Sequence, residues 1–426
     1  MKILIAPDKF KGSLNAAEVC DAITKGIKIN KSKDEIISCP MADGGEGSID
    51  IINNHLSLKP VELIVNDPLF RPIKSTYYFS DLTAYIEMSS ASGLSLLKKE
   101  EQNCMNTSSF GTGELIKDAI NKGLTTINLY IGGSATNDGG VGIASALGFQ
   151  FYDKFKNKLS PIGKNLKSID HIDDSQVNFN FKEITINVIC DVDNPLYGRN
   201  GAAFVYARQK GANSLEIKKL DQGLINLQSI LIKYDYPNVT NIPGSGAAGG
   251  VGGGLVSLLG AKLISGIKNL IEITQVESKI KDCDIIITGE GKIDLQTEKG
   301  KVISGISSLA RKYKKPVIAV CGEEEKNVSV KLGLKKVYTI LEIADSISDA
   351  IVNGDKYLIE IGSKILTDLK KNPEKNQGFA EKEGFEPPEV WPSTVFKTAA
   401  FDHSAISPNT VANIHDFVDK IFFIES

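Results

Sequence analysis

The chain has 426 residues, of which 42% are hydrophobic and 24% are charged, and its formal net charge is −3. This composition is typical of a globular protein, and the length favours two domains, with a third possible. The slightly acidic balance argues against a basic face for nucleic acid, and no apolar run approaches the ~18 residues of a membrane span. We expect no signal peptide, because the apolar run at residues 3–6 is short and ends at Pro7.

Six cysteines are scattered along the chain, and no two of them have the spacing of metal ligands. Several lie inside apolar runs, such as the one at residues 188–190. We therefore expect buried free thiols and a cytoplasmic protein. The chain has only four histidines, which argues against a histidine-based metal site.

The N-terminal part alternates strand-like and helical patterns. Residues 2–6 predict a short buried strand, and the apolar spacing of residues 16–29 predicts a helix with Asn15 as its N-cap. Residues 35–39 predict a second strand, and a further helical stretch follows that ends near Asn54. This βαβα order indicates a parallel sheet.

The same rhythm returns late in the chain. The patterns predict a strand at 284–288, a helix at 300–313, strands at 316–321 and 336–340, and a helix at 355–370. The middle differs, because alternating segments at 75–79 and 84–88 are typical of a mixed or antiparallel sheet. We therefore expect a doubly wound α/β domain made of both chain ends, with a second domain inserted.

Two polar loops follow the first two predicted strands, and doubly wound folds bind ligands at the carboxyl ends of their strands. Residues 7–13 present Lys9 and Lys11, either of which can hold phosphate as a point charge. Residues 43–47 combine three glycines with two carboxylates that can ligate Mg²⁺, usually through waters. The alternatives are a solvated turn that caps the next helix and a tight turn with a charged tip.

Three further loops also follow predicted strands. Residues 131–140 form the longest glycine-rich polar loop, whose successive N–H groups and following helix can bind an anion. Residues 190–195 carry Asp191 and Asp193, which resemble a metal or general-base pair, although a structural turn before proline is the alternative. Residues 288–294 follow another buried strand.

A Gly-x-Gly-x-x-Gly match at residues 244–249 follows no convincing strand, so we expect it to pack a glycine-rich helix closely and not to bind a dinucleotide. The chain contains neither a Walker P-loop nor a nucleophile elbow. Phosphoryl transfer needs phosphate cradles, a carboxylate-held metal, cations and an oriented hydroxyl. The loops match these needs, so the residues alone predict a phosphotransferase or another nucleotide-binding enzyme.

Seven motifs occur in a fixed order: APDKFKGS at 6–13, MADGGEG at 41–47, EMSSASGL at 87–94, NTSSFGTGEL at 106–115, GGSATNDGG at 132–140, CDVDNP at 190–195 and TGEGKID at 288–294. In this order they resemble the bacterial type-1 glycerate kinase family over residues 1 to about 371. The resemblance implies ATP-dependent phosphorylation of D-glycerate with Mg²⁺, at either the 2- or the 3-hydroxyl. Another small hydroxy-acid kinase or phosphotransferase on the same scaffold is the alternative.

The resemblance also implies a domain organisation and partners. A flavodoxin-like domain would comprise residues 1–66 and 284–371, with a second α/β domain at residues 67–283. The active-site cleft would lie between the two. The partners would be glycerate and ATP, without nucleic acid or membrane, and a homo-oligomer is possible.

Site residues follow from the motifs as hypotheses. Asp191 is predicted to accept the hydroxyl proton, Lys11 to face the phosphoryl group or the glycerate carboxylate, and Asp43 to share in catalysis. The predicted substrate and phosphate contacts are Gly44, Gly45, Gly132, Gly133, Ser134, Thr136, Asn137, Gly289 and Gly291. The predicted metal ligands are Asp43, Glu46, Asp138, Asp193, Glu290 and Asp294. Roles can exchange among these carboxylates.

Residues 372–426 break the α/β pattern. They contain the only tryptophan, Trp391, and closely spaced prolines that suit neither a helix nor a central strand. Residues at about 378–408 resemble a spurious translation of a tRNA gene. We expect a read-through tail without a catalytic role, and a genuine C-terminal extension or binding peptide is the alternative.

Overall fold

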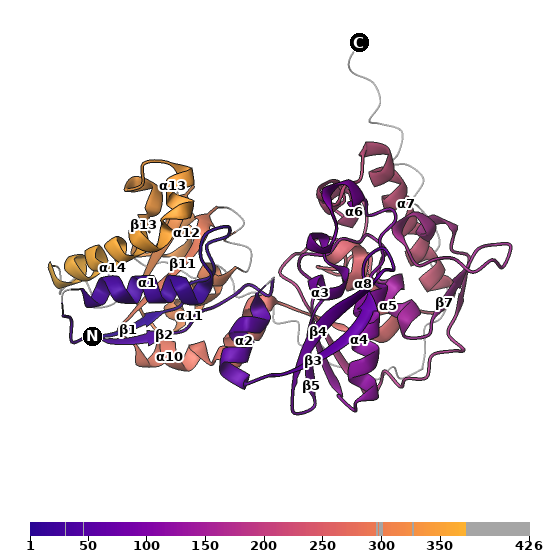
Figure 1. Ribbon diagram of the computed structural model, residues 1–426, viewed down its shortest axis with the longest axis horizontal. Coiled ribbons are helices and arrows are strands. Elements are labelled where there is room, and N and C mark those ends of the chain that lie inside the picture. Colours follow the sequence, from indigo (N-terminus) through magenta and orange to yellow (C-terminus); the bar gives the residue numbers. More distant parts are fainter. Residues whose placement is uncertain (30, 46, 295–296, 298–300, 326–327, 372–426) are drawn as a thin grey trace, which may run out of the picture. The chain divides into compact units, whose positions relative to one another are not determined.

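The computed structural model describes residues 1–371 except 30, 46, 295–296, 298–300 and 326–327 (Figure 1). The chain is an α/β protein with two large sheets, one from both ends of this segment and one from its middle. The tail predicted at residues 372–426 lies outside the described residues. Within the described part, no helix combines the length and the apolar character that a membrane span requires.

The first sheet has five parallel strands in the order β13-β12-β11-β1-β2. They are β1 (Lys2–Ile5), β2 (Glu35–Ser38), β11 (Ile285–Ile293), β12 (Val317–Glu324) and β13 (Lys336–Thr339). Strand β1 joins the two chain segments, because Ile3 pairs with Ile36 on one side and with Ile285 on the other. The predicted sheet made of both chain ends is therefore confirmed.

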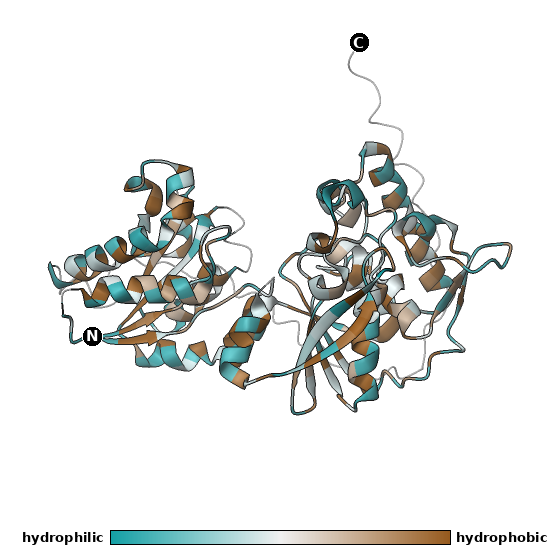
Figure 2. Cartoon of the chain, in the orientation of Figure 1, coloured by the Kyte–Doolittle hydropathy of each residue, from teal (hydrophilic) through white to brown (hydrophobic). Residues whose placement is uncertain are grey.

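Amphipathic helices accompany this sheet. They are α1 (Ala16–Lys28), α2 (Ser48–Leu56), α9 (Gly266–Thr274), α10 (Val276–Asp282), α11 (Val302–Lys312), α12 (Val328–Leu332), α13 (Ile347–Val352) and α14 (Gly354–Lys371). The predicted cap of α1 is confirmed, because Asn15 accepts the Glu18 N–H while the Glu18 carboxylate accepts the Asn15 N–H. Figure 2 shows the helices as two-sided and the strands as largely apolar, as burial of one helix face requires.

The second sheet has six strands in the order β10-β9-β6-β5-β4-β3. They are β3 (Lys59–Asn66), β4 (Pro72–Ser80), β5 (Thr83–Glu87), β6 (Thr126–Tyr130), β9 (Thr185–Ile189) and β10 (Lys262–Ile264). Strands β3, β4 and β5 pair antiparallel and the others parallel, so the sheet is mixed, as its sequence pattern predicts. Residues 1–66 are predicted from the sequence to belong to the first domain. Strand β3 (Lys59–Asn66) nevertheless pairs with β4 in this middle sheet.

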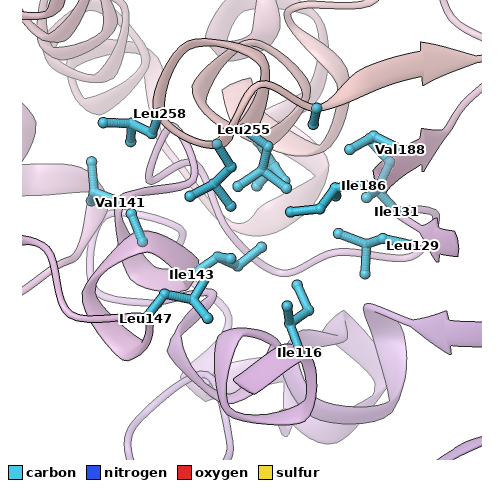
Figure 3. Packing of buried hydrophobic residues seen from close by; sticks show 14 of the residues in the cluster. Ile116, Leu129, Ile131, Val141, Ile143, Leu147, Ile186, Val188, Leu255 and Leu258 are labelled. Carbon is cyan, nitrogen blue, oxygen red and sulfur yellow. The ribbon is translucent and has the colours of Figure 1, made fainter. Parts of the chain in front are cut away.

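The helices of the middle segment are α3 (Ser89–Ser92), α4 (Phe110–Asn121), α5 (Val141–Ala146), α6 (Ala202–Tyr206), α7 (Ser214–Lys233) and α8 (Ala247–Leu259). A small hairpin pairs β7 (Gln150–Tyr152) with β8 (His171–Asp173). Figure 3 shows Ile116 of α4, Ile143 of α5 and Leu255 of α8 packed in one core with residues of β6 and β9. This core fixes the strand ends from which the site loops emerge.

Five short 3₁₀ helices complete the described elements. They are η1 (Leu94–Leu96), η2 (Lys99–Glu101), η3 (Gly163–Ser168), η4 (Arg208–Lys210) and η5 (Ile340–Glu342). Of these, η4 matters most for the site, because it ends on a buried lysine.

One predicted loop is wrong. The sequence predicts a loop after residue 288, but β11 continues to Ile293. The reason lies in its neighbour, because β12 extends alongside it, with Lys292 opposite Glu323 and Ile293 opposite Glu324. Gly289 and Gly291 are therefore strand residues and not loop residues, and their predicted contact with phosphate stays a prediction.

Candidate functional site

A pocket of about 300 Å³ lies where the segments after β2, β6 and β9 meet. Those segments contribute Asp43, Gly44, Gly45, Ile131, Gly132, Gly133, Ser134, Ile189, Cys190, Asp191 and Val192. The other lining residues are Leu94, Tyr206, Gln209, Lys210, Ala247 and Ala248. Three of the predicted site loops therefore converge on one pocket.

Asp191 stands at the end of β9 with its two carboxylate oxygens in different surroundings. Oδ1 accepts hydrogen bonds from Ser265 Oγ at 2.9 Å and from the Gly266 N–H at 2.8 Å. Oδ2 is buried and has no hydrogen-bond partner in the described part of the chain. Burial raises the pKa of Asp191 to about 7. The hydrogen bond from Ser265 lowers this pKa, and the negative charge of Asp43 raises it further. Such a carboxylate is suited to accept a proton near neutral pH.

Gly266 allows the segments that carry Asp43 and Asp191 to approach each other. A Cβ at position 266 would lie 2.2 Å from the Asp43 backbone oxygen and 2.6 Å from Asp191 Oδ2. Any side chain there would block the free oxygen. Ser265 and Gly266 are site residues that the sequence analysis missed, and the only signal was a serine in the N-cap position of α9.

Hydrogen bonds hold the loop at residues 43–45 and, further along, the start of α2. Asp43 Oδ1 accepts the Gly45 N–H at 3.0 Å. Further along, Glu87 at the end of β5 accepts the N–H groups of Gly47 at 3.2 Å and Ile49 at 3.4 Å. Glu87 therefore explains the acidic start of the third motif, because it fixes the entry of the chain into α2.

Several carboxylates gather near Asp43. Burial raises the pKa of Asp8 to about 8, and the charges of Asp43 and Glu290 add to the rise. Burial also raises the pKa of Glu290, whereas a hydrogen bond from Thr297 and the positive charge of Lys301 lower it. Asp8 and Lys301 were not among the predicted site residues. The mutual repulsion of these carboxylates means that a bound cation would be stabilised here.

The fit to Mg²⁺ rests on the donor chemistry of this group. Carboxylate oxygens are the hard ligands that Mg²⁺ prefers, and one or two of them suffice when phosphate and water complete the shell. Among the described residues, no three His, Cys, Asp or Glu side chains form a metal-binding group. Glu46, a predicted ligand, lies outside the described residues.

Other predicted residues lie away from the pocket lining. Lys11 and Asp193 are exposed, and neither lines the pocket. Asp294 lies 3.9 Å from Lys301 Nζ, which is also 3.8 Å from Glu290. The structure therefore places Glu290 and Asp294 together around Lys301 and does not bring Lys11 or Asp193 to Asp191.

Asp138 holds the loop at residues 132–140 in place. Its Oδ2 accepts both the N–H and the hydroxyl of Ser109 at 2.7 Å, and its Oδ1 accepts the Gly140 N–H at 3.1 Å. Burial raises the pKa of Asp138, and these hydrogen bonds oppose the rise. Because both oxygens are occupied and the residue is fully buried, the geometry favours a structural role over the predicted metal role.

The same loop contains buried polar atoms without partners. Thr136 Oγ1 and both polar atoms of Asn137 have no hydrogen-bond partner in the described segment. Within the loop, Gly132, Gly133 and Ser134 line the pocket, whereas Thr136 and Asn137 are not among its lining residues. The pocket-facing part is therefore the glycine-rich half, as an anion cradle requires.

Lys210 is the clearest site residue that the sequence analysis missed. It ends η4, lines the pocket and is only 4% exposed. Its Nζ donates to Ser134 Oγ and to the Thr136 carbonyl oxygen, both at 2.8 Å. Burial lowers the pKa of Lys210 to about 8, although Cys104 and Asp138 act in the opposite direction. The lysine ends the short segment Arg208–Lys210, whose sequence does not separate it from the many surface lysines.

Comparison with known proteins agrees with this geometry. The chain matches the model of the glycerate kinase family over residues 3–370. It is 41% identical to a glycerate kinase of Bacillus cereus and 40% identical to a glycerate 2-kinase of Escherichia coli; each alignment covers 82% of this chain and 93% of the relative. A crystal structure described as a glycerate kinase 2 from Salmonella typhimurium LT2 superposes with a TM-score of 0.75 at 36% identity, covering 88% of this chain and 99% of the other. The chain therefore belongs to the glycerate kinase family.

Proposed function

We propose that this chain transfers a phosphoryl group from ATP to D-glycerate. The proposal rests mainly on Asp191. This residue lines the same pocket as the glycine-rich segment 132–134, and one of its buried carboxylate oxygens has no hydrogen-bond partner among the described residues. A proton acceptor beside an anion cradle is what transfer to a hydroxyl requires. The name of the E. coli relative, glycerate 2-kinase, favours the 2-phospho product for this chain as well.

The proposed mechanism assigns each group one task. Asp191 Oδ2 takes the proton of the acceptor hydroxyl, while Ser265 and Gly266 hold Oδ1 and thereby fix the direction of Oδ2. The N–H groups of residues 132–134 contact phosphate oxygens, because this loop faces the pocket without large side chains. Lys11 stays a candidate for the phosphoryl group, since it follows β1 and its backbone nitrogen lies close to Gly291 of β11, 3.4 Å from where a Cβ on Gly291 would stand.

Mg²⁺ would be held by Asp43 and Glu290, with Asp294 as a further candidate, and would supply neutralisation of the phosphate charge. The strand order of the first sheet, β2-β1-β11-β12-β13, supports a flavodoxin-like doubly wound arrangement, in which ligands bind outside the carboxyl ends of the strands. Free cysteines and the use of ATP support a cytoplasmic place of action.

The test is ³¹P NMR of the purified protein with ATP, Mg²⁺ and D-glycerate. We expect ADP and a single phosphoglycerate, whose chemical shift and coupling identify the 2- or the 3-phospho product. A parallel sample without glycerate separates a kinase from a phosphatase, because only a phosphatase would consume ATP there. ATP consumption that does not depend on D-glycerate would contradict the proposal.

The base assignment is tested by Asp191→Asn, which keeps the shape of the side chain and removes its basicity. We expect kcat/KM to fall by about 10²- to 10⁴-fold, the usual contribution of a general base. Asp21→Asn, an exposed residue of α1, is the matched control and should change kcat/KM less than about twofold. A loss below about tenfold in Asp191→Asn would remove this residue from the role of base.

A further inference from the structure

We propose that Lys210 binds the carboxylate of the acceptor substrate and so selects a hydroxy acid over a neutral polyol. This inference rests on the proposed function and deepens it, because it assigns the part of the pocket that recognises the acid. Within the described residues, Lys210 is the one ammonium group among those that line the pocket.

The position of the ammonium group is fixed by the protein. Two of its three N–H donors are used, one by Ser134 Oγ and one by the Thr136 carbonyl oxygen, each at 2.8 Å. The Lys210 backbone is held as well, because its carbonyl oxygen accepts the Cys104 N–H at 3.0 Å. No acceptor among the described residues takes the third donor, and Lys210 lines the pocket, so we assign this donor to a bound ligand.

Lys210 makes no ion pair among the described residues, and Asp138, whose charge acts on it, has its oxygens occupied by Ser109 and Gly140. The Lys210 side chain is 4% exposed, yet no carboxylate of the described residues forms an ion pair with it. The two hydrogen-bond acceptors are a hydroxyl and a peptide oxygen, both neutral. A buried ammonium is unfavourable unless an anion compensates it, so this arrangement favours occupancy by an anionic ligand.

Two features favour the substrate carboxylate over a phosphate of ATP. Asp191, the proposed acceptor of the hydroxyl proton, lines the same pocket as Lys210. A three-carbon hydroxy acid carries its hydroxyl and its carboxylate within a few bonds, so one molecule can use both residues. In the proposed mechanism the phosphates of ATP are assigned to the N–H groups of the loop at residues 132–134.

The experiment compares D-glycerate with D-glyceramide, in which a neutral amide replaces the carboxylate. Wild-type protein should prefer the acid by about 100-fold or more in kcat/KM, since a site built for a charged group rejects its neutral analogue strongly. In Lys210→Met this preference should fall below about tenfold, with a raised KM for glycerate and a KM for ATP within about threefold of wild type. Lys218→Met, an exposed lysine of α7, is the matched control and should keep the preference.

Each outcome decides one point. An unchanged preference in Lys210→Met overturns the inference, and an unchanged preference together with a raised KM for ATP assigns Lys210 to the nucleotide instead. A wild-type protein that phosphorylates no glycerate overturns the proposed function itself, before any variant is tested. If Lys210→Met does not fold, the test uses Lys210→Arg, which retains the charge. The inference would also be overturned if Lys210→Arg lost ATP binding but kept its preference for the acid.

Discussion

At the scale of single residues, aspartates of one chain acquire different chemistry from their surroundings. Asp138 is fully buried with both oxygens hydrogen-bonded, whereas Asp191 keeps one buried oxygen free. Asp193, two residues further along, is exposed. Of these three aspartates, Asp191 is the one that combines a raised pKa with a free acceptor in the pocket.

The pKa of Asp191 predicts the pH dependence of catalysis. Asp191 must be ionised to accept a proton, and burial raises its pKa to about 7, so kcat/KM should fall as the pH falls below about 7. The hydrogen bond from Ser265 stabilises the ionised form, so Ser265→Ala should move this acidic limb to higher pH. Rate profiles between about pH 5 and 9 measure both effects. A wild-type profile that stays flat down to about pH 5 would contradict the assignment.

The sequence identified Asp191 but not Lys210, for a physical reason. Asp191 directly follows a predicted buried strand, so its place at a strand end could be inferred locally. Lys210 acquires its burial from Ser134 and Thr136, which precede it by 76 and 74 residues. No local pattern contains such a contact. The close approach of Gly266 to the Asp43 segment also joins residues far apart in the sequence, so no local pattern could predict it.

At the scale of elements, periodicity predicted most strands and helices, while their ends depended on neighbours. Strand β11 runs past its predicted end because β12 continues to pair with it. The glycine-rich segment was predicted to pack a helix closely, and α8 confirms this, since a Cβ on Gly249 would lie 2.2 Å from the Thr136 oxygen. The start of α8 is also unusual in its backbone, with Ala248, Gly249 and Gly250 all in the left-handed region.

This left-handed turn gives opposite predictions for two adjacent residues. Ala248 has φ +53°, a conformation that costs a residue with a Cβ about 1–2 kcal/mol. Ala248→Gly removes this cost but gives the unfolded chain more conformational freedom, so the free energy of unfolding should rise by a net amount of about 0.5–1 kcal/mol. Gly249→Ala should lower it by more than about 2 kcal/mol, because the added Cβ meets backbone. Urea unfolding measures both. Equal effects of the two substitutions would show that the turn is not strained as described.

At the scale of the whole molecule, the family match ends at residue 370, close to the end of α14 at Lys371. The proposed site residues lie between Asp8 and Lys301, and both sheets have extensive apolar cores among the described residues up to Leu369. We therefore expect a protein truncated after Lys371 to keep its kcat, its KM for glycerate and its melting temperature. Steady-state kinetics and thermal unfolding of both forms check this. A tenfold loss of activity on truncation would give the tail a catalytic role.

The first sheet pairs strands from both ends of the described chain, so it cannot be completed until late in synthesis on the ribosome. Lys2 of β1 is hydrogen-bonded to Asp284, 282 residues away, at the entry to β11. At about 5–20 residues per second, β1 waits roughly 15–60 s for this neighbour. The middle sheet draws all its strands from residues 59–264, so it can complete its pairing first. A nascent chain thus carries an apolar strand with one open edge for most of its translation, and it gains the carboxylate of Glu290 only when that edge is closed.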